Sequence, residues 1–227
     1  MEPEVTWMNE ISIHKIGQAL GTYVAKKVSR ADQTEVLSFG AEILVGSIIK
    51  LSILFSFAFI MDITLEVAIL LIVTGIIRTL SGGAHCSAYY RCLATSVFIF
   101  TVLGYSIKVN YPFIRQLHPA VLLGILALTF GLYWIYPPQA PSNKPFKDKK
   151  IELAFRWYTL LAVVILSITA IALGFNSLPA WIISIALLWQ AFTLTPVGHR
   201  FIGLFDILLT FKRRPANKSQ EFLRKNL

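Results

Sequence analysis

Both cysteines of the chain, and one of its four histidines, fall within residues 78–92. A cysteine becomes a strong nucleophile as the thiolate, and a neighbouring imidazole can accept its proton. His85 and Cys92 have a spacing that places both side chains on one face of a helix. That spacing also separates their backbones by about 10–11 Å, whereas a hydrogen bond needs about 3 Å. A His–Cys dyad therefore requires His85 to lie on a bent or non-helical segment that folds back towards Cys92.

Two other interpretations of these residues stay open on residue types alone. Free cysteine is often a small buried hydrophobic residue, so the histidine and both cysteines could serve packing. A metal ion could also be bound by His85, Cys86 and Cys92, but a structural site normally has a fourth ligand and none is evident nearby. Cys86 directly follows His85, and neighbouring residues of a helix do not face each other. Cys92 is therefore the better candidate for the nucleophile.

The elements around this segment are typical of a membrane protein. Of the 227 residues, 56% are hydrophobic and 15% are charged, whereas an average soluble domain has about 25% charged residues. Helices of about 20 apolar residues cross the hydrocarbon core of a bilayer. The sequence contains six stretches of this kind, at residues 43–61, 63–80, 93–109, 119–136, 155–174 and 178–196. Residues 110–112, Asn-Tyr-Pro, are expected to form a turn that separates the third stretch from the fourth. We therefore predict an all-α, polytopic membrane helical bundle of about six transmembrane helices.

The N-terminal residues 7–30 carry an apolar stripe at helical spacing, with lysines mostly off that stripe. A basic amphipathic helix of this kind suits the membrane surface, and packing against the protein's own bundle is the equal alternative. We therefore expect an amphipathic cytoplasmic or interfacial segment over residues 1–40. A six-span membrane domain over residues 41–198 and a basic cytoplasmic tail over residues 199–227 are expected to follow it.

The basic residues predict how the spans are oriented. Of the 21 lysines and arginines, all but Lys50, Lys108 and Arg115 fall on one side of the predicted membrane. By the positive-inside rule this is the cytoplasmic side, which then holds both termini. Topology and anionic lipid explain the net charge of +9, so no nucleic-acid partner is expected. Lys50 lies inside the first span, where a charge normally pairs with another helix or faces a cavity.

Residues 78–92 fall at the inner end of the second span, where the chain turns into the third. Ser81, Gly82 and Gly83 are expected to interrupt the helix there. Non-helical backbone at this depth is tolerated only where it is buried in protein or faces water. We therefore expect a small cavity open to the cytoplasm. Backbone N–H groups near the glycine pair or at the start of the third span are the candidate oxyanion donors.

Residues 82–85, Gly-Gly-Ala-His, followed by Cys92, resemble the accessory gene regulator B (AgrB) family. Residues 140–145 in the basic inner loop and residues 194–198 at the end of the last span share the resemblance, which covers about residues 35 to 205. It implies a bacterial integral-membrane cysteine endopeptidase that cleaves a precursor peptide of the AgrD type, leading to a cyclic thiolactone peptide used in quorum sensing. It also implies a site without a cofactor or metal, and a homodimer.

Residue roles follow from the resemblance position by position. His85 matches the catalytic histidine and Cys92 the nucleophilic cysteine. Arg78, Gly82 and Gly83 match residues that flank this motif. The resemblance therefore assigns both members of the dyad and the loop that would carry the histidine.

Two questions about the site are left open by the resemblance. Cys86 matches no functional position of the family, so it is either a bystander or a competing thiol. No third, orienting residue can be matched either. Glu42, Gln190 and Asp206, which lie in or near the predicted membrane, are the candidates for that role.

The loop between the fourth and fifth spans could bind an acidic part of the substrate, or it could only fix the topology and contact anionic lipid. Its basic side chains are Lys144, Lys147, Lys149 and Lys150. The alternative function from another class is a transporter or peptide exporter in which His85 and Cys92 are structural. An enzyme would form a covalent species at Cys92, whereas a transporter would not.

Overall fold

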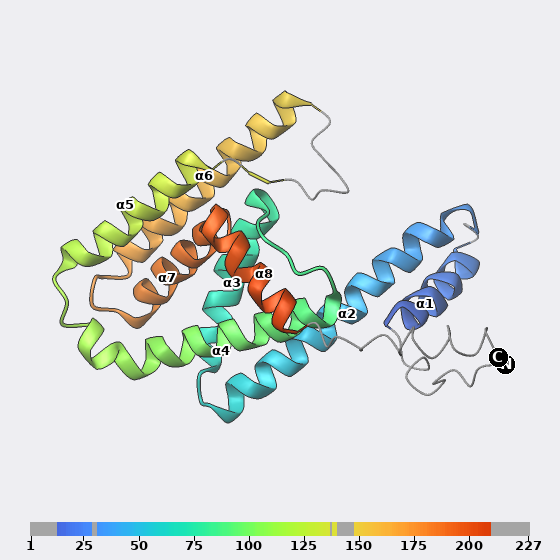
Figure 1. Cartoon of the computed structure of the whole chain (residues 1–227), viewed down its shortest axis with the longest axis horizontal. Helices are drawn as coiled ribbons and strands as arrows, with labels where there is room; N and C mark the ends of the chain where they lie inside the picture. The colour runs from blue at the N-terminus through green and yellow to red at the C-terminus, as the bar shows by residue number, and fades with distance from the viewer. Residues whose placement is uncertain (1–12, 29–30, 137, 140–147, 210–227) are drawn as a thin grey trace, which may run out of the picture. The chain divides into compact units, whose positions relative to one another are not determined.

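The structure, a computed structural model, describes residues 13–28, 31–136, 138–139 and 148–209 (Figure 1). Helices account for almost all of these residues. Their order along the chain is α1 (Ile13–Lys27), the short 3-10 helix η2 (Ala31–Gln33), α2 (Thr34–Ile60), α3 (Thr64–Ser81), α4 (Tyr89–Ile114), α5 (Pro119–Ile135), α6 (Lys149–Ala172), α7 (Leu178–Phe192) and α8 (Pro196–Leu208). The prediction of an all-α helical membrane bundle is confirmed.

Each of the six predicted spans coincides with one helix, from α2 to α7. Within the described residues, α2, α3, α4 and α6 are long and apolar enough to cross a membrane. Helix α5 is apolar but has only 17 residues. Helices α7 and α8 pass the same test as a pair that is bent by 86°. The number of six spans therefore holds only if α5 and α7 cross as short helices, which lie near the lower limit for spanning.

The chain divides into two compact units, residues 1–67 and residues 68–227. In the first unit α1 packs against α2 through its small residues, since Gly17, Gly21 and Ala25 are buried. A Cβ atom on Gly21 would overlap the backbone of Ser38, so the two helices approach closely. The apolar stripe predicted for this segment faces away from α2 and stays exposed, as at Tyr23. Helix α1 thus packs against the protein while its stripe remains available to a membrane surface.

In the second unit α7 packs against both α5 and α6, and Figure 1 shows these three helices lying side by side. Trp181, Ile182 and Leu187 of α7 are almost completely buried, together with Leu122 of α5 and Val163 of α6. The buried polar residue Gln190 lies near the C-terminal end of α7. This end of α7 contacts the loop between α3 and α4 through Gln190.

Two segments differ from their predicted roles. Residues 110–112, predicted to separate two spans, lie inside α4, so that prediction is wrong. Pro112 lies two residues before the end of α4, so any bend that its ring causes affects only the final turn. Residues 199–208, assigned to the tail from the sequence, belong to α8, which begins at Pro196. Thr195 caps this helix by accepting a hydrogen bond of 3.0 Å from the Gly198 N–H.

Candidate active site

Residues 82–88 connect α3 to α4 without helical structure, as the glycine pair predicted. Gly82 has a φ of +68° and Gly83 a φ of +129°, a region that favours glycine. A Cβ on Gly82 would overlap the carbonyl oxygen of Gln139, with which Gly82 forms a single parallel bridge. Glycine is therefore needed at Gly82 both for the backbone angle and for the close approach of a second chain segment.

The first half of this loop is bonded to the end of α7 and to the segment after α5. The buried side chain of Gln190 donates to the Gly82 carbonyl at 2.8 Å. The Ala84 N–H donates to the carbonyl of Thr193 at 3.2 Å, and the Gln139 N–H donates to the carbonyl of Ser81 at 2.8 Å. These bonds satisfy backbone groups that no helix satisfies, which is the condition for non-helical backbone at membrane depth.

The second half of the loop is bonded to α8. The Ser87 N–H donates to Oδ1 of Asp206 at 3.0 Å, and the Ser87 hydroxyl donates to Oδ2 at 2.8 Å. Arg91, in the first turn of α4, lies 3.2 Å from the same carboxylate and donates to the Ser87 hydroxyl at 2.9 Å. The loop is therefore held at both ends, with His85 and Cys86 between the two attachments.

Arg78, in the last turn of α3, contacts His85. Its Nη2 donates to the carbonyl of Ala84 at 2.6 Å and lies 3.1 Å from Nδ1 and 3.2 Å from Nε2 of His85. Because Cε1 lies between the two ring nitrogens, a group in the ring plane and equally close to both would overlap that carbon. The guanidinium nitrogen therefore lies over the ring face. This contact therefore does not occupy the in-plane direction along which either ring nitrogen donates or accepts a hydrogen bond.

The thiol of Cys92 lies in the first turn of α4 and is half-buried. The guanidinium of Arg78 is close enough to attract the thiolate forms of both Cys92 and Cys86. Arg78 thus links the histidine and the cysteine of the predicted dyad, because it contacts the ring of His85 and acts electrostatically on Cys92.

Cys86 has a different environment from Cys92. It packs beside a small apolar cluster of Ala84, Ile99 and Ile202, and its Sγ lies 3.7 Å from the hydroxyl of Thr95. Burial raises the pKa of the Cys86 thiol above its usual value. A raised thiol pKa leaves less thiolate at neutral pH, which works against Cys86 as a nucleophile.

The other predicted positions are distributed as follows. Lys144 and Lys147 lie outside the described residues, whereas Lys149 and Lys150 are exposed at the start of α6. The loop that carries these lysines begins beside the site, since the Gln139 side chain donates to the Leu194 carbonyl at 2.9 Å. Across the described part of the chain, no group of three or more histidine, cysteine or acidic side chains could hold a metal ion.

Two of the three candidates for an orienting residue contact the loop that carries His85, and the third does not. Gln190 and Asp206 both bond to the loop that carries His85. Glu42 instead pairs with His14 at 3.0 Å in the N-terminal unit. Two residues that hold the loop were not predicted from the sequence. Ser87 bonds the loop to α8, and Thr193 bonds it to the end of α7. The spacing of Ser87 and Arg91, four residues apart, is the one local signal that could have indicated their contact.

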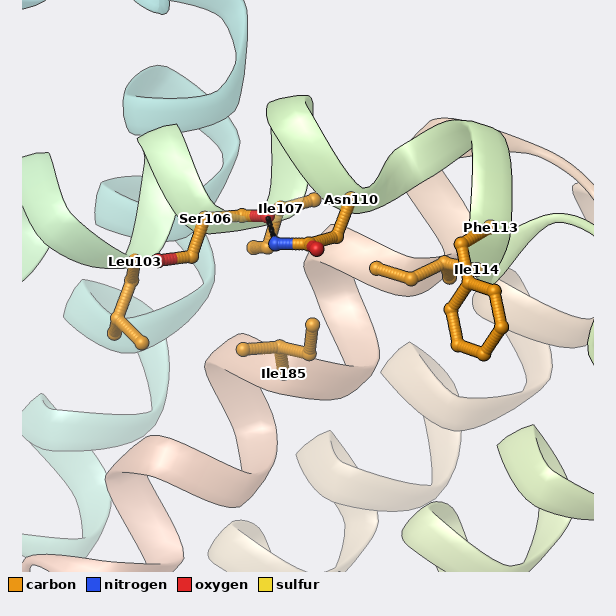
Figure 2. A pocket seen from close by; sticks show the side chains of 7 residues that line it. All are labelled: Leu103, Ser106, Ile107, Asn110, Phe113, Ile114 and Ile185. Atoms are coloured by element: carbon orange, nitrogen blue, oxygen red, sulfur yellow. Dashed lines mark hydrogen bonds between the residues drawn. The ribbon is translucent and has the colours of Figure 1, made fainter.

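A separate cavity of about 360 Å³ lies between α4 and α7 (Figure 2). It is apolar apart from Ser106 and Asn110, and the Asn110 amide donates to the Ser106 carbonyl at 2.7 Å. Its lining consists of Leu103, Ser106, Ile107, Asn110, Phe113, Ile114 and Ile185. At 1.5 Å per residue, Leu103 is about 16 Å further along α4 than Cys92. The cavity is therefore not part of the site around His85 and Cys92.

Comparisons with known proteins agree on one family. The family model described as Accessory gene regulator B matches residues 14–194. An AgrB-like protein of Clostridium perfringens strain SM101 is 27% identical over 203 residues, which cover 82% of this chain and 95% of that protein. The accessory gene regulator protein B of Staphylococcus aureus strain Newman is 26% identical over 186 residues, covering 81% and 93% of the two chains. No solved structure matches the chain.

Proposed function

Because this chain belongs to the accessory gene regulator B family, we propose that it is a membrane-embedded cysteine endopeptidase that processes a quorum-sensing precursor peptide. The observation that carries the proposal is the position of Arg78. Its guanidinium contacts His85 and attracts the thiolate of Cys92. The position of Arg78 therefore supports a site in which Cys92 is the nucleophile and His85 the base.

In the proposed first step, the Cys92 thiolate attacks the scissile carbonyl of the precursor, after His85 has accepted the thiol proton. His85 then returns this proton to the departing amine, which leaves with the C-terminal part of the peptide. The N-terminal part remains attached to Cys92 as a thioester. Backbone N–H groups of the loop at Gly82 and Gly83 are the candidate oxyanion donors.

In the second step, a cysteine thiol of the bound peptide attacks the thioester carbonyl. The new thiolactone forms as the bond to Cys92 breaks, and the proton of the attacking thiol returns to the Cys92 sulfur through His85. One thioester replaces another, so the exchange is nearly balanced in free energy. Water would hydrolyse the intermediate instead, so the site has to exclude it. The packed backbone of the loop against α7 supports this requirement.

The proposed substrate is a precursor of the AgrD type that reaches the site from the cytoplasmic face of the bacterial inner membrane. Lys149 and Lys150 are exposed at the start of α6, and Gln139 connects their loop to the strand bridge at Gly82. These lysines, with Lys144 and Lys147, would receive the acidic part of the peptide. A homodimer with both termini in the cytoplasm completes the proposal.

The test is to trap the thioester. The full chain is co-expressed with the precursor peptide encoded beside it, and its intact mass is measured. We expect a species heavier by the N-terminal part of the peptide, released by hydroxylamine and mapped to Cys92. The Cys86→Ala protein should show the same species. Folded protein that carries no adduct, or an adduct mapped to Cys86, would contradict the proposed mechanism.

Replacing Arg78 tests the cation of the site. We expect Arg78→Ala to slow thioester formation about 10²- to 10³-fold, the usual loss for one electrostatic stabiliser. Arg78→Lys should recover only part of the rate, because an ammonium group does not reproduce the geometry with which the guanidinium contacts both the Ala84 carbonyl and the His85 ring. The matched control is Arg156→Ala, which removes another arginine that donates to a backbone carbonyl, that of Trp134 at 2.8 Å. A wild-type rate of thioester formation in Arg78→Lys would show that the positive charge alone is sufficient and that the shape of the guanidinium is unimportant.

A further inference from the structure

We propose that Asp206 of α8 is a positioning residue, which holds residues 82–88 in the conformation that presents His85 to Cys92. This inference rests on the proposed function. The match to the family model ends at residue 194, before α8 begins at Pro196. Asp206 therefore lies beyond the residues that the family model matches.

The carboxylate of Asp206 meets the loop two residues after His85. It accepts hydrogen bonds from the N–H and the hydroxyl of Ser87, at 3.0 and 2.8 Å, and it pairs with Arg91 at 3.2 Å. Hydrogen bonds to an ionised carboxylate are about twice as strong as those between neutral groups. Arg91 also donates to the Asp206 backbone carbonyl, at 3.4 Å. One aspartate thus connects α8 to the loop and to the first turn of α4, which carries Cys92.

Helix α8 is itself fixed to the rest of this unit, so Asp206 has a rigid support. Phe205 lies 5.6 Å from Phe98 of α4 and 5.1 Å from Phe201, measured between ring centroids. Phe201 packs in turn against Trp189 and Phe192 at the end of α7. Aromatic pairs at these separations add to the stability of an interface. The position of Asp206 is therefore set by packing on both α4 and α7.

A second contact of α8 reaches the same short stretch of the loop. Ile202, one turn before Asp206, is buried against Ala84 and Ile99, and Cys86 packs beside this cluster. Helix α8 therefore touches the residues immediately before and after His85. Together with the bonds from α7 to Gly82 and Ala84, these contacts leave the loop little freedom to turn the imidazole away from Cys92.

The alkylation of Cys92 by iodoacetamide tests this role without requiring a substrate. In the Cys86→Ala protein Cys92 is the single thiol of the chain, so its alkylation rate can be followed by intact mass. A histidine beside the thiol adds an inflection near neutral pH, which His85→Ala should remove. The titratable and charged groups around this loop are Arg78 on α3, Tyr89, Arg91 and Cys92 on α4, and Asp206 on α8.

We expect Asp206→Ala to lose the same inflection as His85→Ala. It should also slow thioester formation about 100-fold with KM unchanged, as expected when a reacting group is displaced by about 1 Å. Asp206→Asn should keep the inflection and stay within about tenfold of wild type, because its oxygen and its amide can still bond the N–H and the hydroxyl of Ser87. Ser87→Ala should add little to Asp206→Ala, since both remove the same contact.

The matched control is Arg200→Ala, which removes a charged and exposed side chain from the same helix and should leave both readouts unchanged. An aspartate that only stabilises α8 would lower thermal stability and leave the pH profile of Cys92 alkylation intact. A wild-type profile in folded Asp206→Ala would therefore overturn the inference. If Asp206→Ala does not fold, the double variant Asp206→Asn with Ser87→Ala replaces it. Loss of the inflection in its alkylation profile would support the inference, and a wild-type profile would overturn it. Failure of wild type to form a thioester would instead contradict the proposed function, since the alkylation profile is independent of the precursor.

Discussion

Replacing Cys92 with alanine is expected to abolish cleavage of the precursor peptide, whereas the same change at Cys86 is expected to leave it. Loss of the nucleophile from a catalytic group that acts as a unit costs about 10⁴-fold or more in rate. Cys86→Ala removes a thiol that packs beside Ile99 and Ile202 and whose pKa is raised by burial, so only stability should change. The readout is the rate at which the C-terminal fragment is released, measured by mass spectrometry.

His85→Ala provides the second arm of that experiment. Removal of a general base usually costs about 10²- to 10⁴-fold, so a slow, residual formation of the thioester is expected while Cys92 is present. The residual rate should rise with pH, because hydroxide can then ionise the thiol without the imidazole. Cleavage that survives in Cys92→Ala and is lost in Cys86→Ala would show that the nucleophile has been misassigned. Equal cleavage in all variants would mean that another protein cleaves the precursor. It would favour the alternative in which this chain is a transporter or peptide exporter.

The local parts of the site could be predicted from the sequence because their signals are local. The glycine pair after an apolar stretch indicated a break in the helix, and the structure shows positive φ angles at Gly82 and Gly83. The apolar stretches located helices α2 to α7 to within a few turns. Local signals also misled at residues 110–112, where Asn and Pro suggested a turn. Helix α4 nevertheless continues to Ile114, with the Asn110 amide bonded to the Ser106 carbonyl and Pro112 only two residues from the helix end.

The contacts that shape the loop could not be predicted in this way, because their partners are far apart along the chain. Ser87 and Asp206 are separated by 119 positions, and Gly82 and Gln190 by 108. The sequence proposed Gln190 and Asp206 only as polar residues in an apolar region, with no reason to prefer them to Glu42. The packing of Cys86 also depends on a residue far along the chain. Cys86 becomes a packing residue through Ile202, which belongs to a helix more than 100 residues later.

Gly82→Ala is expected to lower the rate of thioester formation at least about 100-fold, because it moves the loop that carries His85. The added methyl group would overlap the carbonyl oxygen of Gln139, and the backbone at Gly82 has a φ of +68°. Relief requires the bridge to open, which frees the Ser81 carbonyl from the Gln139 N–H. Backbone groups left unpaired in a buried position cost about 1–3 kcal/mol each, so a displaced loop is the less costly outcome.

Gly75→Ala is the matched control, since it makes the same change on α3 where a Cβ would meet no atom within 4 Å. Alanine is preferred to glycine inside a helix by about 0.5–1 kcal/mol, so this variant should be fully active and at least as stable. Cleavage rates and thermal melts of the two proteins therefore separate the effect of an added methyl group from the effect of its position. A Gly82→Ala protein that forms the thioester at the wild-type rate would show that the bridge to Gln139 does not position His85. In that case the attachments from α7 and α8 alone would have to hold the loop.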